Sequence, residues 1–440
     1  MKNVLKRLVL GWLGIVTALP DPCNHFNHDD CHSDMIVTRD IAVIGGGSTG
    51  TYSAIRLRDF GKIDIGVVVW HDLDLVKNYF ARFNIPLVKA DLSFSGTTRY
   101  VDYRTGQEVK GYSYMQKNMQ KNFTSALARY TTQLVKYPYI EDGFDLPEPV
   151  PADLLFPFGD FVKKYALDDF VGFLFRFAQG LGDLLHQPTL YVFKNFGSDV
   201  IRDLQVGFLT TQRHNNHELY ENAQAELGAD ALLSSHIIAV DRSAEDYAYI
   251  VSDTPSGIKL IQAKKIVFTI PPKLHNLRGF DLDATERCLF AQFGNSGYYT
   301  GLLRNTGIPV NVTIDNVGAD TLYNLPALPG IYGLSQTGMP GLISVKYGSA
   351  TGLPDDQVMA DIISKVKLLY PASTPEFAVF SSHTPFELTV PASAINAGFY
   401  KKLYRLQGYR KTWYTGAAFH THDSSLLWQF TEKLLPSIAA

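Results

Sequence analysis

Three glycines near the start of the chain have the spacing that dinucleotide phosphates require. The sequence GGGSTG begins at Gly45, directly after the apolar run 41–44 and before a helical pattern over 51–60. Gly45 allows a tight turn, Gly47 lets the backbone approach a pyrophosphate, and Gly50 lets the helix pack against the strand. The apolar run predicts a fully buried strand.

Two hydroxyl residues, Ser48 and Thr49, precede the last of these glycines, where the helix is expected to begin. The free N–H groups and the positive dipole end of a helix N-terminus favour bound phosphate. We therefore count both residues with the glycines as cofactor-binding. A strand-to-helix turn that binds no ligand is the alternative.

An acidic residue should follow about 20 residues later, at the end of a second strand, to bind the adenosine ribose. The stretch 63–70 has the right spacing, with Asp72 or Asp74 as the acid. However, Asp64 and Gly66 inside this stretch fit a central parallel strand poorly.

A second glycine turn lies near the end of the chain, where 411–418 predicts a short strand followed by Gly416. His420, His422 and Asp423 come next, before a helix over 426–435 that Asp423 or Ser424 would cap. Three potential ligands within four residues do not readily close a tetrahedral metal site. A helix N-terminus directed at a polar or anionic ligand is the better interpretation, so we predict no metal site.

The elements that must position these turns alternate between helices and short strands. Helical patterns cover 77–83, 114–136, 160–185 and 218–228, and strand patterns cover 231–240, 247–252, 258–261 and 265–270. A proline-rich stretch over 146–158 predicts a loop. The strand-rich region 298–347 predicts an antiparallel sheet of a second domain. Phenylalanines in 160–185 indicate a core face or the wall of an apolar substrate pocket.

The first residues have the three-part pattern of a secretory signal peptide, which we place at 1–18. An anchoring helix is the alternative, but the apolar run 8–19 is shorter than the roughly 20 residues that span a bilayer. We expect a secreted or secretory-pathway protein without an integral membrane span. Asn122 and Asn311 begin N-glycosylation triplets.

Three cysteines occur in 440 residues. Cys23 and Cys31 follow the signal peptide and could form a disulfide, bind metal with nearby histidines, or stay unpaired. Cys288 is expected to be a buried thiol. The length of 440 residues predicts two intertwined domains, and 46% hydrophobic residues supply a large core. The net charge of -3, without a basic excess, predicts no nucleic-acid partner.

With both ends considered, the chain resembles the FAD-dependent oxidoreductases of the flavin amine oxidase type, most closely the secreted fungal branch named for beta-cyclopiazonate dehydrogenase. The resemblance rests on 41–50, 63–68, 233–241, 263–272, 413–419 and 423–425. It implies an α/β fold in which a three-layer, Rossmann-like FAD-binding domain carries an inserted α+β substrate domain. The FAD-binding domain would comprise 36–110, 200–285 and 405–440, and the substrate domain 111–199 and 286–404.

The same resemblance assigns roles to residues. Gly45, Gly47 and Gly50 would hold the FAD pyrophosphate, and Ile237 would meet the adenine through its backbone. Near the isoalloxazine we expect the final helix N-terminus at the flavin N1/O2 edge, together with Thr415, Gly416 and Ala417. The same resemblance places the candidate catalytic residues Tyr414 and His420 near the flavin.

One departure from the family pattern affects the expected activity. Family members carry the second strand and a flavin-contacting glycine pair before their Asp-x-Gly-Val motif, whereas here Asp64 follows Gly61 almost directly. We therefore assign Asp64 to the later motif, infer that about one strand and loop is missing, and expect weakened FAD retention.

The resemblance implies hydride removal from a C–H or C–N centre, with oxygen or another acceptor restoring the flavin. The aromatic residues suggest an apolar organic substrate, such as an indole alkaloid or terpenoid of fungal secondary metabolism. The alternatives are an FAD-dependent oxidative cyclase or isomerase of a biosynthetic cluster, or a degenerate, non-catalytic secreted homologue.

Overall fold

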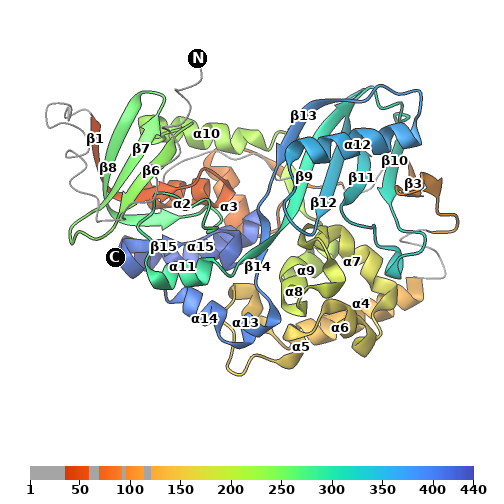
Figure 1. Cartoon of the computed structure of the whole chain (residues 1–440), viewed down its shortest axis with the longest axis horizontal. Helices are drawn as coiled ribbons and strands as arrows, with labels where there is room; N and C mark the ends of the chain where they lie inside the picture. Colours follow the sequence, from red (N-terminus) through yellow and green to blue (C-terminus); the bar gives the residue numbers. More distant parts are fainter. Residues whose placement is uncertain (1–34, 59–68, 92–95, 113–119) are drawn as a thin grey trace, which may run out of the picture.

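The computed structural model describes residues 35–58, 69–91, 96–112 and 120–440. The predicted signal peptide, Cys23, Cys31 and Asp64 lie outside these ranges. Figure 1 shows two halves side by side, each built around one large sheet. None of the described helices is both long enough and apolar enough to cross a membrane.

The first sheet brings together the start, the middle and the end of the chain around β8 (Gly257–Phe268). β1 (Ile36–Ile44) pairs with β8 in parallel along one edge, and β15 (Thr412–Tyr414) pairs in parallel with the end of β8 on the opposite edge. β7 (Ala248–Thr254) is antiparallel to the first part of β8, and β6 (His236–Asp241) is antiparallel to β7.

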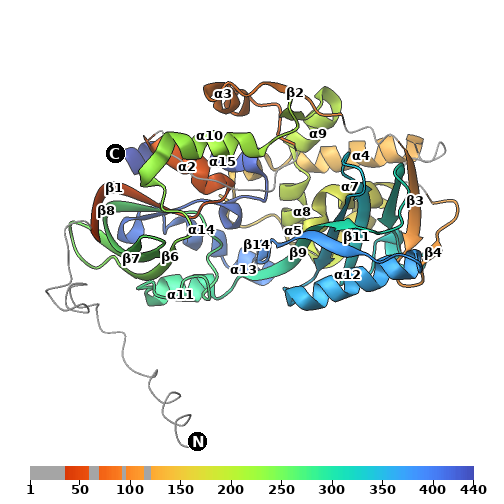
Figure 2. The same ribbon diagram turned by 90° about the horizontal axis from the view of Figure 1, so that it is seen from above.

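Three helices lie on the same side of this sheet in Figure 2: α2 (Ser48–Arg58), α10 (His217–Leu227) and α15 (Ser424–Ala439). α2 packs directly on α15, because Tyr52 stacks on Trp428 with ring centroids 5.1 Å apart. α3 (Asp74–Arg82) contacts α15, and β2 (Leu87–Lys89) pairs with β5 (Leu209–Thr211) nearby.

Eight strands of the described residues form the second sheet. They are β3 (Thr97–Asp102), β4 (Gln107–Glu108), β9 (Gly294–Arg304), β10 (Val312–Asn316), β11 (Gly330–Gln336), β12 (Ile343–Ser349), β13 (Glu376–Ser382) and β14 (Phe386–Thr389). α12 (Asp355–Leu369) covers one face, and α4 (Gln120–Leu134) and α7 (Val171–Ala178) lie on the other (Figure 2). The shorter helices are α5 (Ala152–Leu155), α6 (Phe158–Tyr165), α8 (Thr189–Asn195), α9 (Ser198–Val206), α11 (Ala284–Phe290), α13 (Ala392–Asn396) and α14 (Phe399–Tyr404).

The structure corrects the boundary expected at residue 110. β3 and β4 belong to the second sheet, because β3 pairs in parallel with β10. This parallel pair also makes the second sheet mixed rather than purely antiparallel. The helix patterns at 77–83 and 218–228 are confirmed by α3 and α10.

Two other elements differ from the sequence prediction. The helical pattern over 160–185 forms several short helices, since Ala166 and Gly182 adopt positive φ angles of 52° and 69°. The two strands predicted at 258–261 and 265–270 form the single strand β8. Its polar Lys264 does not interrupt it, because Lys264 pairs with Asp40 of β1 at 2.7 Å.

Two burial predictions were wrong. Cys288 is exposed, because it lies on the outer side of α11, whose Leu289 and Phe290 point inward. The apolar run 41–44 is only partly buried, with Ile44 alone below a tenth exposed. Among the described residues, β1 is an edge strand with no neighbour on its outer side.

Candidate functional site

The two glycine turns meet at Thr269, which follows β8. Gly45 (φ +119°) follows β1, and Gly416 (φ +107°) follows β15. A methyl group on Gly45 would overlap Thr269 Oγ1, and one on Gly416 would lie 2.9 Å from Thr269 O. The turns therefore converge at the carboxyl ends of three parallel strands, where α/β sheets bind their ligands.

The helix that follows Gly45 begins in direct contact with the turn. A methyl group on Gly50 would overlap Gly45 O and lie 2.8 Å from Thr269 Oγ1. The carbonyl of Gly47 accepts a hydrogen bond from Thr51 N at 2.8 Å, so α2 starts here. The first N–H groups of a helix have no partners within it, and this geometry suits a pyrophosphate.

The two hydroxyl residues of this first turn face the protein interior. Ser48 Oγ accepts a hydrogen bond from the indole nitrogen of Trp428 at 3.2 Å. Thr49 is buried, and its carbonyl accepts from Ser53 Oγ at 2.7 Å. Ser48 thus links the start of α2 to α15, and contact with a cofactor would come through backbone groups.

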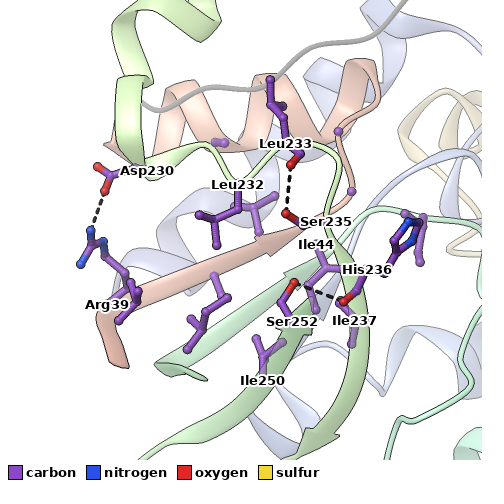
Figure 3. A pocket seen from close by; sticks show the side chains of 18 of the residues that line it. Arg39, Ile44, Asp230, Leu232, Leu233, Ser235, His236, Ile237, Ile250 and Ser252 are labelled. Carbon is purple, nitrogen blue, oxygen red and sulfur yellow. Dashed lines mark hydrogen bonds and ion pairs between the residues drawn. The ribbon is translucent and has the colours of Figure 1, made fainter. Parts of the chain in front are cut away.

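A cavity of about 640 Å³ runs from the first glycine turn along β1 (Figure 3). Ile237 of β6 forms part of the opposite wall, which is where the adenine was expected. This volume lies within the usual range for small-molecule sites. Most of the lining is apolar, and it includes Val37, Ile41, Ile44, Leu232, Leu233, Ile250 and Phe280.

One ion pair lies at the far end of this cavity, between Arg39 Nη2 and Asp230 Oδ1 at 2.6 Å (Figure 3). The acids expected to bind ribose lie elsewhere. Asp72 pairs with Lys77 at 2.5 Å, and the side chain of Asp74 is 95% exposed. Asp230, which sequence reasoning missed, is the carboxylate that lines the cavity, and it follows a helix rather than a strand.

The second glycine turn is tightly packed. Thr415 is buried, its backbone N donates to Phe268 O at 3.0 Å, and its hydroxyl lies 3.0 Å from that of Thr431. Ala417 begins the turn of 3₁₀ helix 417–419 that leads toward α15. Asp423 caps α15, as predicted, by accepting from Leu426 N at 3.0 Å.

A buried histidine joins the N-terminus of α15 to α9. His71 Nδ1 lies 2.6 Å from Asp203, and His71 Nε2 lies 3.3 Å from Asp423. Burial disfavours the charged imidazole, but the two carboxylates outweigh burial and raise the pKa of His71 to about 10. A positive charge is therefore fixed at the end of the helix expected to face the flavin.

Tyr414 lies in a buried charge cluster. Its hydroxyl donates to Glu286 Oε1 at 2.9 Å, and Glu286 pairs with Arg242 at 2.8 Å. Burial, reinforced by the Glu286 charge, raises the pKa of Tyr414 well above its usual value. In this arrangement the phenol acts as a hydrogen-bond donor that satisfies a buried carboxylate.

His420 and His422 have different partners. His420 is buried, and its Nε2 lies 2.9 Å from Glu141 O and 3.3 Å from Lys194 Nζ. Burial and Lys194 hold the pKa of His420 well below its usual value. His422 Nε2 accepts a hydrogen bond from the backbone N of Glu387 at 3.0 Å. Within the described ranges no cluster of three metal-ligating side chains occurs.

Solved structures share this fold. The chain matches the conjugated-linoleic-acid-producing fatty acid isomerase from P. acnes with a TM-score of 0.71 and 15% identity, over 91% of this chain and 99% of that one. Two amine oxidases match with TM-scores of 0.61 and 0.58. No family model matches the sequence. The fold is that of the flavin amine oxidases.

Sequence relatives identify the family. The chain is 38% identical to FAD-dependent oxidoreductase oblC of Cochliobolus heterostrophus, over 97% of this chain and 96% of the relative. It is 34% identical to beta-cyclopiazonate dehydrogenase of Aspergillus oryzae, over 92% and 94%. It therefore belongs to the family of fungal FAD-dependent oxidoreductases that includes these two proteins, and its cofactor is FAD.

The residues present fit this cofactor. At the first glycine turn, Gly45 and Gly50 pack against Thr269 without room for a side chain, and the cavity beside Ile237 continues from this turn. Beside the second glycine turn, the buried carboxyl oxygen Oε1 of Glu387 has no hydrogen-bond partner among the described residues. Neither Glu387 nor His71 was recognised from the sequence, because nothing in their local patterns indicates where they lie.

Proposed function

We propose that this chain oxidises an apolar organic molecule of fungal secondary metabolism, of the alkaloid or terpenoid class. Bound FAD would supply the two-electron acceptor, and oxygen or another acceptor would restore it. The observation that carries this proposal is the convergence of two glycine turns, from opposite ends of the chain, on Thr269. The name of one relative, beta-cyclopiazonate dehydrogenase, supports the substrate class.

Aromatic residues beside the second turn support an apolar substrate. Tyr298 of β9 stacks on Phe386 of β14 with centroids 4.8 Å apart, and Phe386 lies 3.9 Å from the ring of His422. All three are only partly buried. By contrast, Phe161 and Phe170 are fully buried core residues, so they cannot contact a substrate.

Anaerobic mixing with candidate substrates tests the reaction class. The FAD-saturated protein is mixed with beta-cyclopiazonate or with indoline, a simple oxidisable amine, and the flavin absorbance is followed. Bleaching without oxygen, and oxygen uptake or dye reduction when an acceptor is present, would support net oxidation. A changed product without acceptor consumption would instead favour the cyclase or isomerase alternative.

A non-catalytic homologue is the second candidate, favoured by the outer edge of β1, which pairs with no strand among the described residues. The alignment with oblC spans 469 positions although this chain has 440 residues, so the relative carries residues without a counterpart here. We propose that this difference weakens FAD retention. A stoichiometric yellow protein would show that the gap is tolerated, whereas cooperative folding without FAD uptake would favour a non-catalytic role.

We also propose that the chain follows the secretory route. Asn122 on α4 and Asn311 before β10 are exposed, so both acceptor side chains are accessible. Expression in a fungal host should give secreted protein whose electrophoretic mobility increases after removal of N-linked glycans. Asn122→Gln and Asn311→Gln should each remove part of that change.

A further inference from the structure

Glu387 is a buried carboxyl at the junction of the two halves. It lies on β14, which crosses between them in Figure 1 and packs beside 417–419, directly after Gly416. Its residue exposure is 7%. A methyl group on Gly180 would lie 3.6 Å from Glu387 Cγ, so the helical part of the second half also touches this side chain.

This carboxyl is only partly satisfied. Asn195 of α8 hydrogen-bonds to it, but Oε1 has no partner within the described ranges. A buried, unpaired polar atom is destabilising, and such atoms are uncommon in native proteins. The unpaired Oε1 is therefore an acceptor that a bound group could use.

The backbone at Glu387 is also strained. Its φ is +42°, in the left-handed region that non-glycine residues rarely adopt. The conformation is held by the hydrogen bond from Glu387 N to His422 Nε2 and by the packing of Phe386 on the His422 ring. Strained residues held by their surroundings cluster at active sites.

The groups around the carboxyl supply no positive charge. His422 is neutral, because burial and the neighbouring His383 lower its pKa to about 3. Tyr191 and Tyr400 share a hydrogen bond of 2.8 Å, and burial raises the pKa of both. Burial therefore raises the pKa of Glu387 to about 7, where a carboxyl exchanges protons readily at neutral pH.

Given the oxidoreductase function proposed above, we propose that Glu387 is a catalytic residue that accepts the proton released when the substrate is oxidised. The substrate C–H bond breaks and its hydrogen leaves with the electron pair as hydride, which reduces the oxidised FAD. The neighbouring N–H or C–H bond breaks with its electron pair retained to form the new double bond. That proton passes to the Glu387 carboxylate and then to solvent.

The test uses the full-length chain with added FAD and needs no substrate. The wild type, Glu387→Gln and the control Glu376→Gln, an exposed glutamate of β13, are first titrated with FAD. The two-electron reduction potential and the absorbance spectrum of the bound flavin are then measured between pH 5 and pH 9, a range of about two units on each side of neutrality. Because glutamine keeps the shape but cannot ionise, only the ionisation is removed.

We expect the absorbance of the oxidised flavin in the wild type and in Glu376→Gln to show one ionisation near pH 7. We expect Glu387→Gln to bind FAD equally, and its oxidised-flavin absorbance to show no such ionisation. If this ionisation is absent from the wild-type holoprotein, or if it persists in Glu387→Gln, the role of Glu387 is overturned while the FAD function remains intact. Absence of FAD binding in the wild type would be seen in the first titration. That result would overturn the proposed function, and with it the role of Glu387.

Discussion

The two ends of the FAD-binding half are built differently. At the end where we expect the adenosine (the adenosine end), a largely apolar cavity opens along β1, and its ion pair, Arg39–Asp230, has side chains that are 50% and 35% exposed. Beside β15, which precedes the glycine turn where we expect the flavin (the flavin end), Arg242 and Glu286 pair with side-chain exposures of 1% and 0%. The Arg242–Glu286 pair is therefore fully desolvated, whereas the Arg39–Asp230 pair remains partly solvated.

The position of β1 at a sheet edge explains the open end. A strand on its outer side would cover residues 41–43, which remain partly exposed. Packing covers the flavin end, because β15 pairs with β8 and α15 packs on α2. Because of this difference in burial, we predict that substitutions at the flavin end mainly reduce stability. Substitutions at the adenosine end should mainly reduce the affinity for FAD.

The largest expected effect is that of Arg242→Met. This change removes the nearer cation of the buried Glu286 and leaves only Arg410 at 3.3 Å, and breaking a buried ion pair destabilises proteins by about 3–5 kcal/mol. Urea denaturation of the wild type and the variant measures this change in the free energy of unfolding. The double variant Arg242→Met/Glu286→Gln should recover part of the loss, and a loss below about 1 kcal/mol in the single variant would contradict the comparison.

His71→Gln should have the second-largest effect. Its free energy of unfolding should fall by about 3 kcal/mol at neutral pH, because Asp203 and Asp423 lose their shared cation. Since the pKa of His71 is raised in the fold, its stabilisation is complete below about pH 6.5 and disappears as pH rises through about 10. Urea unfolding between pH 6 and pH 10 should show this decline in the wild type, and a flatter profile in the variant. Identical profiles would disprove the charged imidazole.

Gly45→Ala should reduce both stability and cofactor binding. Because of the positive φ and the overlap with Thr269 Oγ1, the free energy of unfolding should fall by about 2 kcal/mol. The affinity for FAD should fall strongly. Gly294→Ala is the control, since its added methyl group would meet nothing closer than 3.7 Å. Unfolding in urea and titration with FAD check both quantities. If Gly45→Ala bound FAD with wild-type affinity, the first glycine turn would not be part of the FAD site.

Arg39→Met should have the smallest effect on stability, below about 1 kcal/mol, because the pair with Asp230 is half solvated. It should lower FAD affinity by more than it lowers stability, since Arg39 itself lines the cavity. Urea unfolding together with calorimetric FAD titration separates the two. A loss of stability comparable to that of Arg242→Met would break the proposed contrast between the two ends.

The sequence predicted the parts of the site that depend on local backbone. Gly45 and Gly416 both adopt the positive φ angles that glycine turns require, and Asp423 caps α15. Properties that depend on distant neighbours were missed. The burial of β1 depends on whether a strand lies beside it, and His71 meets Asp203 and Asp423 only after folding. The strained position of Glu387 likewise requires His422, 35 residues away.

The central claim is that both glycine turns form one FAD site, and FAD titration of the purified chain tests it most directly. Flavin absorbance and fluorescence are followed for the wild type, Gly45→Ala and Gly416→Ala. We expect saturable binding of one FAD per wild-type chain and a large loss of affinity in both variants. No saturable binding to the folded wild type, or unchanged affinity in either variant, would contradict a single site that both turns share.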